Sequence, residues 1–125
     1  TRHAVNAACV KHKTPLVSGA AIRFSGQLSV FDTRRKSAPC YNCLFPEADE
    51  SEETRCAIMG VFAPLTGIIG AMQAAEALKV ISETGEPAVG RLLLLDALTM
   101  EWRCVKYGKD PLCAVCGSAP TSAGN

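Results

Sequence analysis

The sequence predicts an α/β fold in which helices pack on a mixed or antiparallel sheet. Short apolar or alternating runs, which are typical of strands, occur at residues 16–22, 27–31 and 91–96. A longer run that begins at Pro64 repeats its apolar residues every three or four positions, as an α-helix does. Two Cys-x-x-Cys pairs far apart in the chain predict a metal site between distant segments. A chain of 125 residues is long enough for one buried core.

The first ten residues predict a short helix. Val5, Ala8 and Cys9 are spaced so that they share one apolar face of a helix. Thr1 is a residue type that caps helix N-termini, and Pro15 prevents the helix from continuing.

Two strands are predicted next. The run at residues 16–22 is small and apolar, which favours a strand that is buried on both faces and paired in parallel. Ser25 and Gly26 are a turn signal, and residues 27–31 then alternate between polar and apolar, as a half-buried strand does.

Residues 32–56 have no hydrophobic period and predict a surface loop. Three consecutive basic residues at 34–36 are followed by five acidic residues between positions 47 and 53. Such a composition cannot bury enough apolar surface to offset the entropy of ordering. We therefore expect residues 47–56 to be mobile.

Pro64 marks the first turn of the longest predicted helix. Its apolar residues at helical spacing are Leu65, Ile68, Ile69, Met72, Ala75 and Leu78. Gly85 and Pro87 mark its end. Residues 57–75 contain no charged side chain, but a proline, a threonine, a glutamine and three glycines make them too polar for a membrane span.

The last regular elements predicted are two strands, at residues 91–96 and 101–107, which a short connection joins into a hairpin. Small residues at 121–125 predict a disordered tail. The sequence contains no internal repeat.

Composition and charge exclude several classes of protein. Thirteen basic and twelve acidic side chains leave a formal net charge of +1, so no overall field attracts nucleic acid or an anionic membrane. Seven cysteines without a secretory signal favour reduced thiols in a cytoplasmic protein over a disulfide framework. Because the first residue is Thr1 and not methionine, we expect a piece of a longer protein.

Cysteine spacing gives the strongest chemical signal. Cys40 and Cys43 form one Cys-x-x-Cys knuckle, and a second knuckle consists of Cys113 and Cys116. Four thiolates complete the tetrahedral shell of a structural Zn²⁺ ion and leave no position open for catalysis. The alternatives are two redox-active pairs or unligated thiols, although neither pair opens a helix after a strand as a thioredoxin-like motif does.

The remaining cysteines differ in their setting. Cys9 lies on the apolar face of the first helix and Cys104 lies within a strand pattern, so we interpret both as small buried hydrophobic residues. Cys56 follows Arg55 at the end of the acidic segment. A neighbouring cation makes a thiol more nucleophilic and nearby carboxylates oppose that effect. Cys56 is therefore a candidate catalytic thiol, with an inert cysteine as the alternative.

Other catalytic patterns are absent from the sequence. Its two histidines, His3 and His12, fall into no Ser/His/Asp or Cys/His arrangement. Its glycines form no phosphate-binding loop, because Gly60, Gly67 and Gly70 lie in or beside the long helix. These 125 residues by themselves predict neither a hydrolase nor a nucleotide site.

The order of motifs resembles one family over nearly the whole chain. The motifs are Pro-Leu-Val-Ser-Gly-Ala-Ala-Ile-Arg at 15–23, Gly-Gln at 26–27, Pro-Cys-Tyr-Asn-Cys-Leu-Phe-Pro at 39–46, Cys56, Gly-Ile-Ile-Gly at 67–70, Glu-Ala-Leu-Lys at 76–79, Asp-Ala at 96–97 and the knuckle at 113–117. They resemble the sulfur-carrier adenylyltransferases, which are similar to ubiquitin-activating enzymes, and above all the molybdopterin-synthase branch of that family.

The resemblance implies a Rossmann-type α/β fold in which residues 1–120 are the C-terminal, carrier-binding and zinc-binding part. The family's nucleotide-binding half precedes this part, so no ATP-binding residue can be assigned here. The implied activity uses ATP and Mg²⁺ to adenylate the C-terminal glycine of a ubiquitin-like sulfur carrier ending in Gly-Gly, for molybdenum cofactor biosynthesis. The resemblance also implies a cytoplasmic homodimer.

The resemblance further implies roles for individual cysteines. The four knuckle cysteines match the family's structural zinc ligands, and Cys56 matches the position where relatives place a thiol that links covalently to the activated carrier. Two alternatives stay open. The carrier can be one for thiamine synthesis or tRNA thiolation, or the chain can be a zinc-stabilised interaction module without catalysis.

Overall fold

The computed structural model describes residues 1–46 and 60–117 as four antiparallel strands with helices. The elements in chain order are α1 (Arg2–His12), β1 (Leu16–Ile22), β2 (Ser25–Phe31), α2 (Tyr41–Leu44), α4 (Ala63–Ser82), β3 (Arg91–Asp96) and β4 (Glu101–Lys106). The strands form one sheet in the order β1-β2-β3-β4, each antiparallel to its neighbour. The expected α/β fold with an antiparallel sheet and a β3–β4 hairpin is confirmed.

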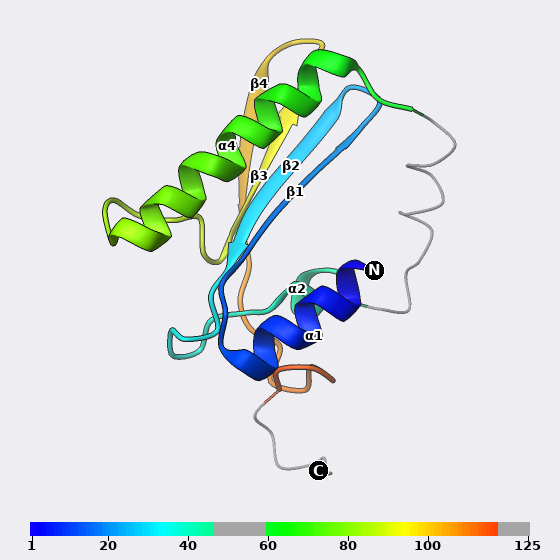
Figure 1. The fold of residues 1–125 in the computed structure, drawn as a ribbon. Coiled ribbons are helices and arrows are strands. Elements are labelled where there is room, and N and C mark those ends of the chain that lie inside the picture. The colour runs from blue at the N-terminus through cyan, green and yellow to red at the C-terminus, as the bar shows by residue number, and fades with distance from the viewer. Residues whose placement is uncertain (47–59, 118–125) are drawn as a thin grey trace.

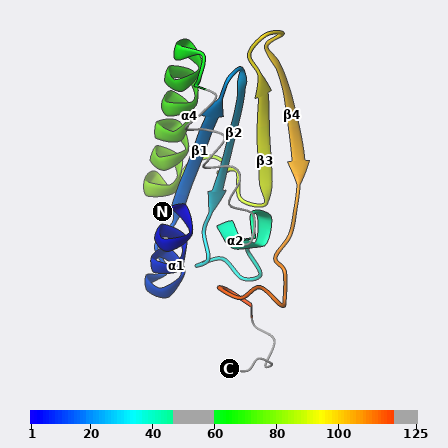
Figure 2. The same cartoon turned by 90° about the vertical axis from the view of Figure 1, so that its right-hand side faces the viewer.

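One face of β1 and β2 is covered by α4, and the other helices lie beyond the end of the strands. Figure 1 shows α4 running along the sheet, with α1 and α2 below it. Figure 2, seen from the side, shows the segment after β4 returning to α1 and α2. Residues near positions 6, 40 and 113 therefore meet at one end of the molecule.

Two glycines allow α4 to lie close to β1 and β2. A Cβ on Gly19 would lie 2.6 Å from Cδ of Gln73 and 2.7 Å from Cγ2 of Ile69. A Cβ on Gly26 would lie 2.8 Å from Cδ1 of Ile69. Because real Cβ atoms do not approach other atoms this closely, the helix occupies the space that a larger residue would need.

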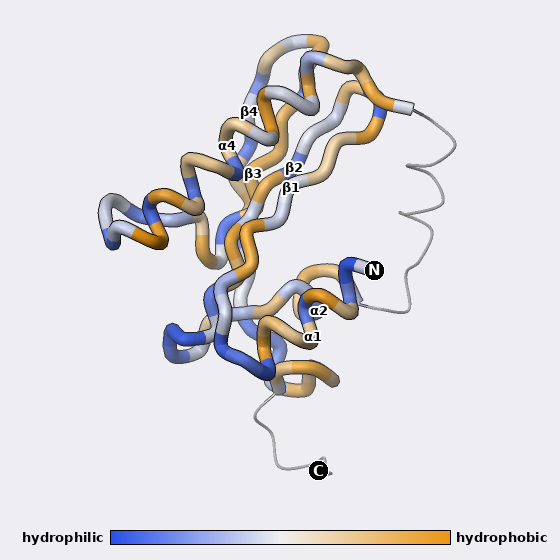
Figure 3. The backbone as a smooth tube through the Cα atoms, in the orientation of Figure 1, coloured by the Kyte–Doolittle hydropathy of each residue, from blue (hydrophilic) through white to orange (hydrophobic). Residues whose placement is uncertain are grey.

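The core between α4 and the sheet is small and apolar. Leu65 and Ile69 of α4 pack with Leu95 of β3, and Leu65 is 0% exposed. Full burial of such a side chain stabilises a fold by roughly 1.5–3 kcal/mol, so these contacts hold the helix on the sheet. Figure 3 shows apolar residues recurring along α4, while hydrophilic residues gather in the connection between β2 and α2.

A buried carboxylate fixes the second half of α4. Glu76 is 5% exposed, and its Oε1 accepts a hydrogen bond from the backbone N–H of Ala88 at 2.8 Å. Its Oε2 lies 2.6 Å from Nζ of Lys79. The carbonyl of Ala88 accepts from the N–H of Val30 on β2. Glu76 thus connects α4 to the sheet through one residue, Ala88.

The burial of the strands differs from the expectation. β1 pairs antiparallel with β2, so the predicted parallel pairing is wrong, and most of its residues are half-buried. β2 is more buried than a half-buried strand, because β1 and β3 flank it and α4 covers one of its faces. The residues at 16–22 are small and apolar because α4 packs closely on this strand.

The helices also differ in which residues they bury. In α4, the predicted apolar positions Ala75 and Leu78 are exposed, and Glu76 is buried in their place. In α1, Val5 and Ala8 are exposed and Asn6 is the buried residue. The end of α4 at Ser82, just before Gly85, agrees with the prediction.

Three further expectations concern the loop after β2, the chain segments outside the described residues, and membrane spans. Residues 41–44 form the one-turn helix α2 within the predicted loop. Residues 47–56 and 121–125, for which the sequence predicts mobility and disorder, lie outside the described residues. Across residues 1–46 and 60–117, no helix combines the length and the apolar character needed to cross a membrane.

Candidate metal centre

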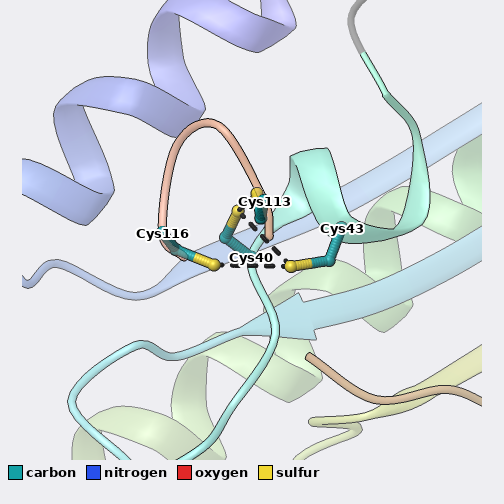
Figure 4. A group of neighbouring side chains, drawn as sticks. All are labelled: Cys40, Cys43, Cys113 and Cys116. Atoms are coloured by element: carbon teal, nitrogen blue, oxygen red, sulfur yellow. Dashed lines mark hydrogen bonds between the residues drawn. The ribbon is translucent and has the colours of Figure 1, made fainter. Parts of the chain in front are cut away.

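Two turns of similar construction bring four cysteines together. Cys40 occupies the N-cap of α2 and Cys43 lies within that helix, where its backbone N–H donates to the carbonyl of Cys40 at 3.0 Å. The second pair, Cys113 and Cys116, lies in the segment after β4. There the N–H of Gly117 donates to the carbonyl of Cys113 at 2.9 Å. Figure 4 shows the four sulfur atoms pointing toward one another.

The distances between the sulfur atoms fit a tetrahedral metal ion. The Sγ atoms of Cys40 and Cys113 lie 3.7 Å apart, those of Cys43 and Cys116 lie 3.4 Å apart, and those of Cys40 and Cys43 lie 4.0 Å apart. All four atoms fall within 4.8 Å of one another. Zinc–sulfur bonds of about 2.3 Å in a tetrahedron place the sulfurs about 3.8 Å apart. A disulfide requires about 2.05 Å, so neither knuckle is an oxidised pair.

Hydrogen bonds to the sulfur atoms support their ionised form. The side-chain amide of Asn42 donates to Sγ of Cys113 at 3.5 Å, and that of Asn6 donates to Sγ of Cys40 at 3.5 Å. The backbone N–H of Asp110 donates to Sγ of Cys43 at 3.4 Å. Thiolates, and not thiols, bind metal ions, and N–H groups aimed at the sulfur stabilise that charge.

Without a bound cation, the surroundings favour the thiolate form of Cys113 and oppose it at Cys43 and Cys116. Burial raises the pKa of the Cys113 thiol, but hydrogen bonds from the Asn42 side chain and from two backbone N–H groups outweigh it and lower the pKa to about 6. Burial raises the pKa of the Cys43 and Cys116 thiols. Several negative sulfurs in a buried cluster repel one another, so the cluster needs a cation to exist as four thiolates.

Gly117 is part of this construction. A Cβ at this position would meet the backbone carbonyl oxygens of Pro111 and Cys113, the former at 2.8 Å. Only glycine allows the chain to close so tightly after the second knuckle. The glycine that follows the Cys-x-x-Cys pair in the sequence is explained by this contact.

Of the cysteines that the structure describes, Cys9 and Cys104 lie outside the cluster. Cys104 is exposed on β4, so its interpretation as a buried hydrophobic residue is wrong, because that strand is covered on neither face. Cys9 is half-buried on α1. Cys56, the candidate catalytic thiol, lies outside the described residues.

Sequence reasoning missed the two asparagines that contact the sulfurs. Asn42 lies between the cysteines of the first knuckle, so its position in the motif was a usable signal. Asn6 is distant in sequence, and its only signal is a polar residue within a run of small apolar ones. Its contact with Cys40 depends on how α1 packs against α2.

Comparison with known proteins finds a matching family model and several similar proteins named as adenylyltransferases. Residues 1–115 match the model of the ThiF family. The chain is 47% identical over 116 residues to the molybdopterin-synthase adenylyltransferase of Salmonella typhimurium, a match that covers 93% of this chain and 46% of that protein. It is 43% identical over 125 residues to the sulfur carrier protein adenylyltransferase of Thermus thermophilus, covering 97% of this chain and 46% of that protein.

A eukaryotic relative is also similar. The chain is 46% identical over 123 residues to the adenylyltransferase and sulfurtransferase MOCS3 of Anopheles gambiae, covering 97% of this chain and 27% of that protein. The chain thus spans about half the length of the bacterial relatives and less of MOCS3.

Solved structures share the fold at low sequence identity. The crystal structure of E. coli MccB superposes with a TM-score of 0.71 at 21% identity, covering 91% of this chain and 35% of that one. A heterocyclase in complex with substrate and cofactor superposes with a TM-score of 0.69 at 14% identity, covering 92% of this chain and 18% of that one.

Proposed function

Because the chain belongs to the ThiF family, we propose that it works as part of an ATP-dependent adenylyltransferase that activates the C-terminal glycine of a ubiquitin-like sulfur carrier. The observation that carries the proposal is the 47% identity, over 93% of the chain, to a molybdopterin-synthase adenylyltransferase. This relative favours the carrier that serves molybdenum cofactor biosynthesis. The alternatives are a carrier for thiamine synthesis or for tRNA thiolation.

The proposed reaction forms an acyl-adenylate. An oxygen of the carrier's C-terminal carboxylate attacks the α-phosphorus of ATP, the bond from that phosphorus to the bridging oxygen breaks, and pyrophosphate leaves with the electron pair. A carboxylate is a weak nucleophile, so the rate depends on positioning and on neutralising phosphate charge, to which Mg²⁺ contributes. The carrier's glycine then has a good leaving group for sulfur transfer.

The cysteine cluster has a structural part in this proposal. Cys40, Cys43, Cys113 and Cys116 would hold one Zn²⁺ ion, which, when bound, supplies a cross-link and no open coordination position. It would tie the segment after β4 to α2 at the end of the sheet, and so hold the C-terminal end of β4 in place.

The exposed strand β4 supports a partner-binding role. Every residue of β4 is exposed, and Trp102 and Val105 are each 41% exposed. Beside it lies a hollow of about 560 Å³ whose lining includes Arg103. An edge strand with unpaired backbone groups and apolar side chains is suited to bind an extended segment or another sheet.

ATP–pyrophosphate exchange tests the function. We expect the full-length protein to exchange labelled pyrophosphate into ATP only when a carrier ending in Gly-Gly is present. Residues 1–125 alone should show no exchange, because they contain no glycine-rich phosphate loop. Comparing carriers of the molybdenum, thiamine and tRNA-thiolation pathways identifies the substrate by the largest kcat/KM.

The variant Trp102→Ala is compared with the wild type in the same exchange experiment. It should raise the carrier concentration needed for half-maximal exchange and leave the maximal exchange unchanged, because Trp102 would contact the carrier and not the phosphates. If the full-length protein bound the carrier but showed no exchange, the result would contradict the proposed adenylyltransferase activity. It would favour the non-catalytic interaction module. Robust exchange by residues 1–125 alone would show that the nucleotide site has been misplaced.

Cys56 is proposed as a thiol that receives the activated carrier. Its sulfur would attack the glycine carbonyl of the acyl-adenylate, releasing AMP and forming a thioester. We expect Cys56→Ala to retain pyrophosphate exchange and to lose carrier sulfuration, measured by the mass of the carrier. Cys9→Ala, which removes a half-buried thiol on α1 and leaves β4 unchanged, is the control and should keep both. Normal sulfuration by Cys56→Ala would remove Cys56 from the mechanism.

The cellular setting of the enzyme is part of the proposal. None of the six cysteines in the described part of the chain forms a disulfide, which fits the reducing cytoplasm. A homodimer is proposed because α4 exposes Leu78 and Ile81, at 65% and 78%, on its outer face. A molar mass measured by light scattering that corresponds to one chain would contradict the dimer.

A further inference from the structure

α1 is attached to the candidate metal centre through one side chain. Asn6, 1% exposed, is the buried residue of this helix. Its Nδ2 donates to Sγ of Cys40 at 3.5 Å, and its Oδ1 accepts from the backbone N–H of Tyr41 at 3.0 Å. The amide therefore bonds both to a sulfur of the cluster and to the first residue of α2.

Other contacts of α1 are weaker. The ring of His3, one turn before Asn6, meets the ring of Tyr41 edge-on with centroids 5.2 Å apart. The apolar residues Val5 and Ala8 are exposed and add little burial. α1 has no side-chain hydrogen bond at its N-cap. A helix of 11 residues is marginal in water by itself, so its position depends on its few tertiary contacts.

From this geometry we propose that Asn6 is a positioning residue that couples metal binding at the four-cysteine cluster to the docking of α1. When Cys40 is a metal-bound thiolate, the bond from Asn6 is charge-assisted and about twice as strong as a neutral one. Without the cation, no metal bond holds Sγ of Cys40 in place for this hydrogen bond, and α1 loses part of its attachment. The ion then orders three chain segments, those near residues 6, 40 and 113, and not only the two that supply ligands.

The coupling is reciprocal by thermodynamic necessity, because the factor by which metal binding favours the docked helix is also the factor by which the docked helix tightens metal binding. Asn42 offers a comparison within the same site. It also donates an amide N–H to a cluster sulfur at 3.5 Å, but this bond joins α2 to the segment after β4 and does not involve α1. Loss of Asn42 should weaken the metal site while α1 remains coupled to it.

The experiment compares Asn6→Ala with Asn42→Ala in the full-length protein. Zinc affinity is measured by chelator competition, and amide hydrogen exchange is followed in residues 2–12 with zinc bound and after its removal. Both variants should bind zinc roughly 10-fold more weakly. In the wild type and in Asn42→Ala, removal of zinc should speed exchange in α1 about 10-fold. In Asn6→Ala, exchange in α1 should be fast with or without zinc.

A second variant keeps the test informative if Asn6→Ala folds poorly. Asn6→Asp keeps the oxygen that accepts from Tyr41 but replaces the N–H donor with a negative charge beside Cys40. It should bind zinc more weakly than Asn6→Ala, because like charges repel in a buried site. Exchange in β2 serves as the control for an intact sheet. Wild-type zinc affinity in both Asn6 variants, or zinc-independent exchange in α1 of the wild type, overturns the proposal.

Discussion

Replacing Cys113 with serine should remove the bound metal ion and strongly destabilise the protein. A structural zinc ion contributes roughly 10 kcal/mol or more of apparent binding free energy, and a serine hydroxyl does not replace a thiolate ligand. The substitution also leaves the amide of Asn42 without the sulfur to which it donates. We expect bound zinc to fall from one ion per chain toward none and the melting temperature to drop by more than about 10 °C.

The matched control for this prediction is Cys104→Ser, which changes an exposed cysteine of β4 outside the cluster. It should keep its zinc and melt within about 2 °C of the wild type. Elemental analysis of protein purified without chelator measures the metal, and calorimetry measures the unfolding. A Cys113→Ser protein that retains full zinc and wild-type melting would show that the cluster binds no structural ion.

Replacing Gly19 with valine should separate α4 from the sheet. Valine is normally favoured over glycine in a strand, so propensity alone predicts a gain in stability. Here a Cβ would lie 2.6 Å from Gln73 and 2.7 Å from Ile69, and valine adds two methyl groups beyond it. Overpacking of this kind costs roughly 1–3 kcal/mol, and displacing Ile69 from the core adds to the loss. Urea unfolding should show a net destabilisation of about 3 kcal/mol.

The control substitution is Gly108→Ala, at a glycine with no atom within 4 Å of the added Cβ. It should change the free energy of unfolding by less than about 0.5 kcal/mol. If Gly19→Val were as stable as the wild type, α4 could not lie as close to β1 as the structure places it.

The metal cluster and the hairpin are the parts that local sequence predicts well. Pro39 precedes the first Cys-x-x-Cys knuckle, and Pro111 and Gly117 flank the second, so the turn of each knuckle is determined within a few residues. β3 and β4 are joined by a short connection, and neighbouring strands with such a connection pair as a hairpin. The turn of each knuckle and the hairpin depend on neighbouring residues, although the two knuckles meet only through the fold.

The predictions about burial failed where contacts between residues far apart in the sequence determine which side chains are covered. Glu76 was not expected inside the core, yet it is buried because the N–H of Ala88 and the ammonium group of Lys79 satisfy its charge. Cys104 was expected to be buried, yet it is exposed because α4 covers β1 and β2 and leaves β4 open. Hydrophobic periodicity identifies a face but not what covers it.

The sequence by itself determined the number of strands and their succession along the chain, the long helix, the two knuckles and the family. Each of these depends on residues that are close in the chain or on a motif pattern. Only the tertiary structure decided that β1 is antiparallel to β2, that Gly19 and Gly26 make room for α4, and that Asn6 reaches Cys40. These contacts join residues far apart in sequence, and their energies depend on distances that no local pattern encodes.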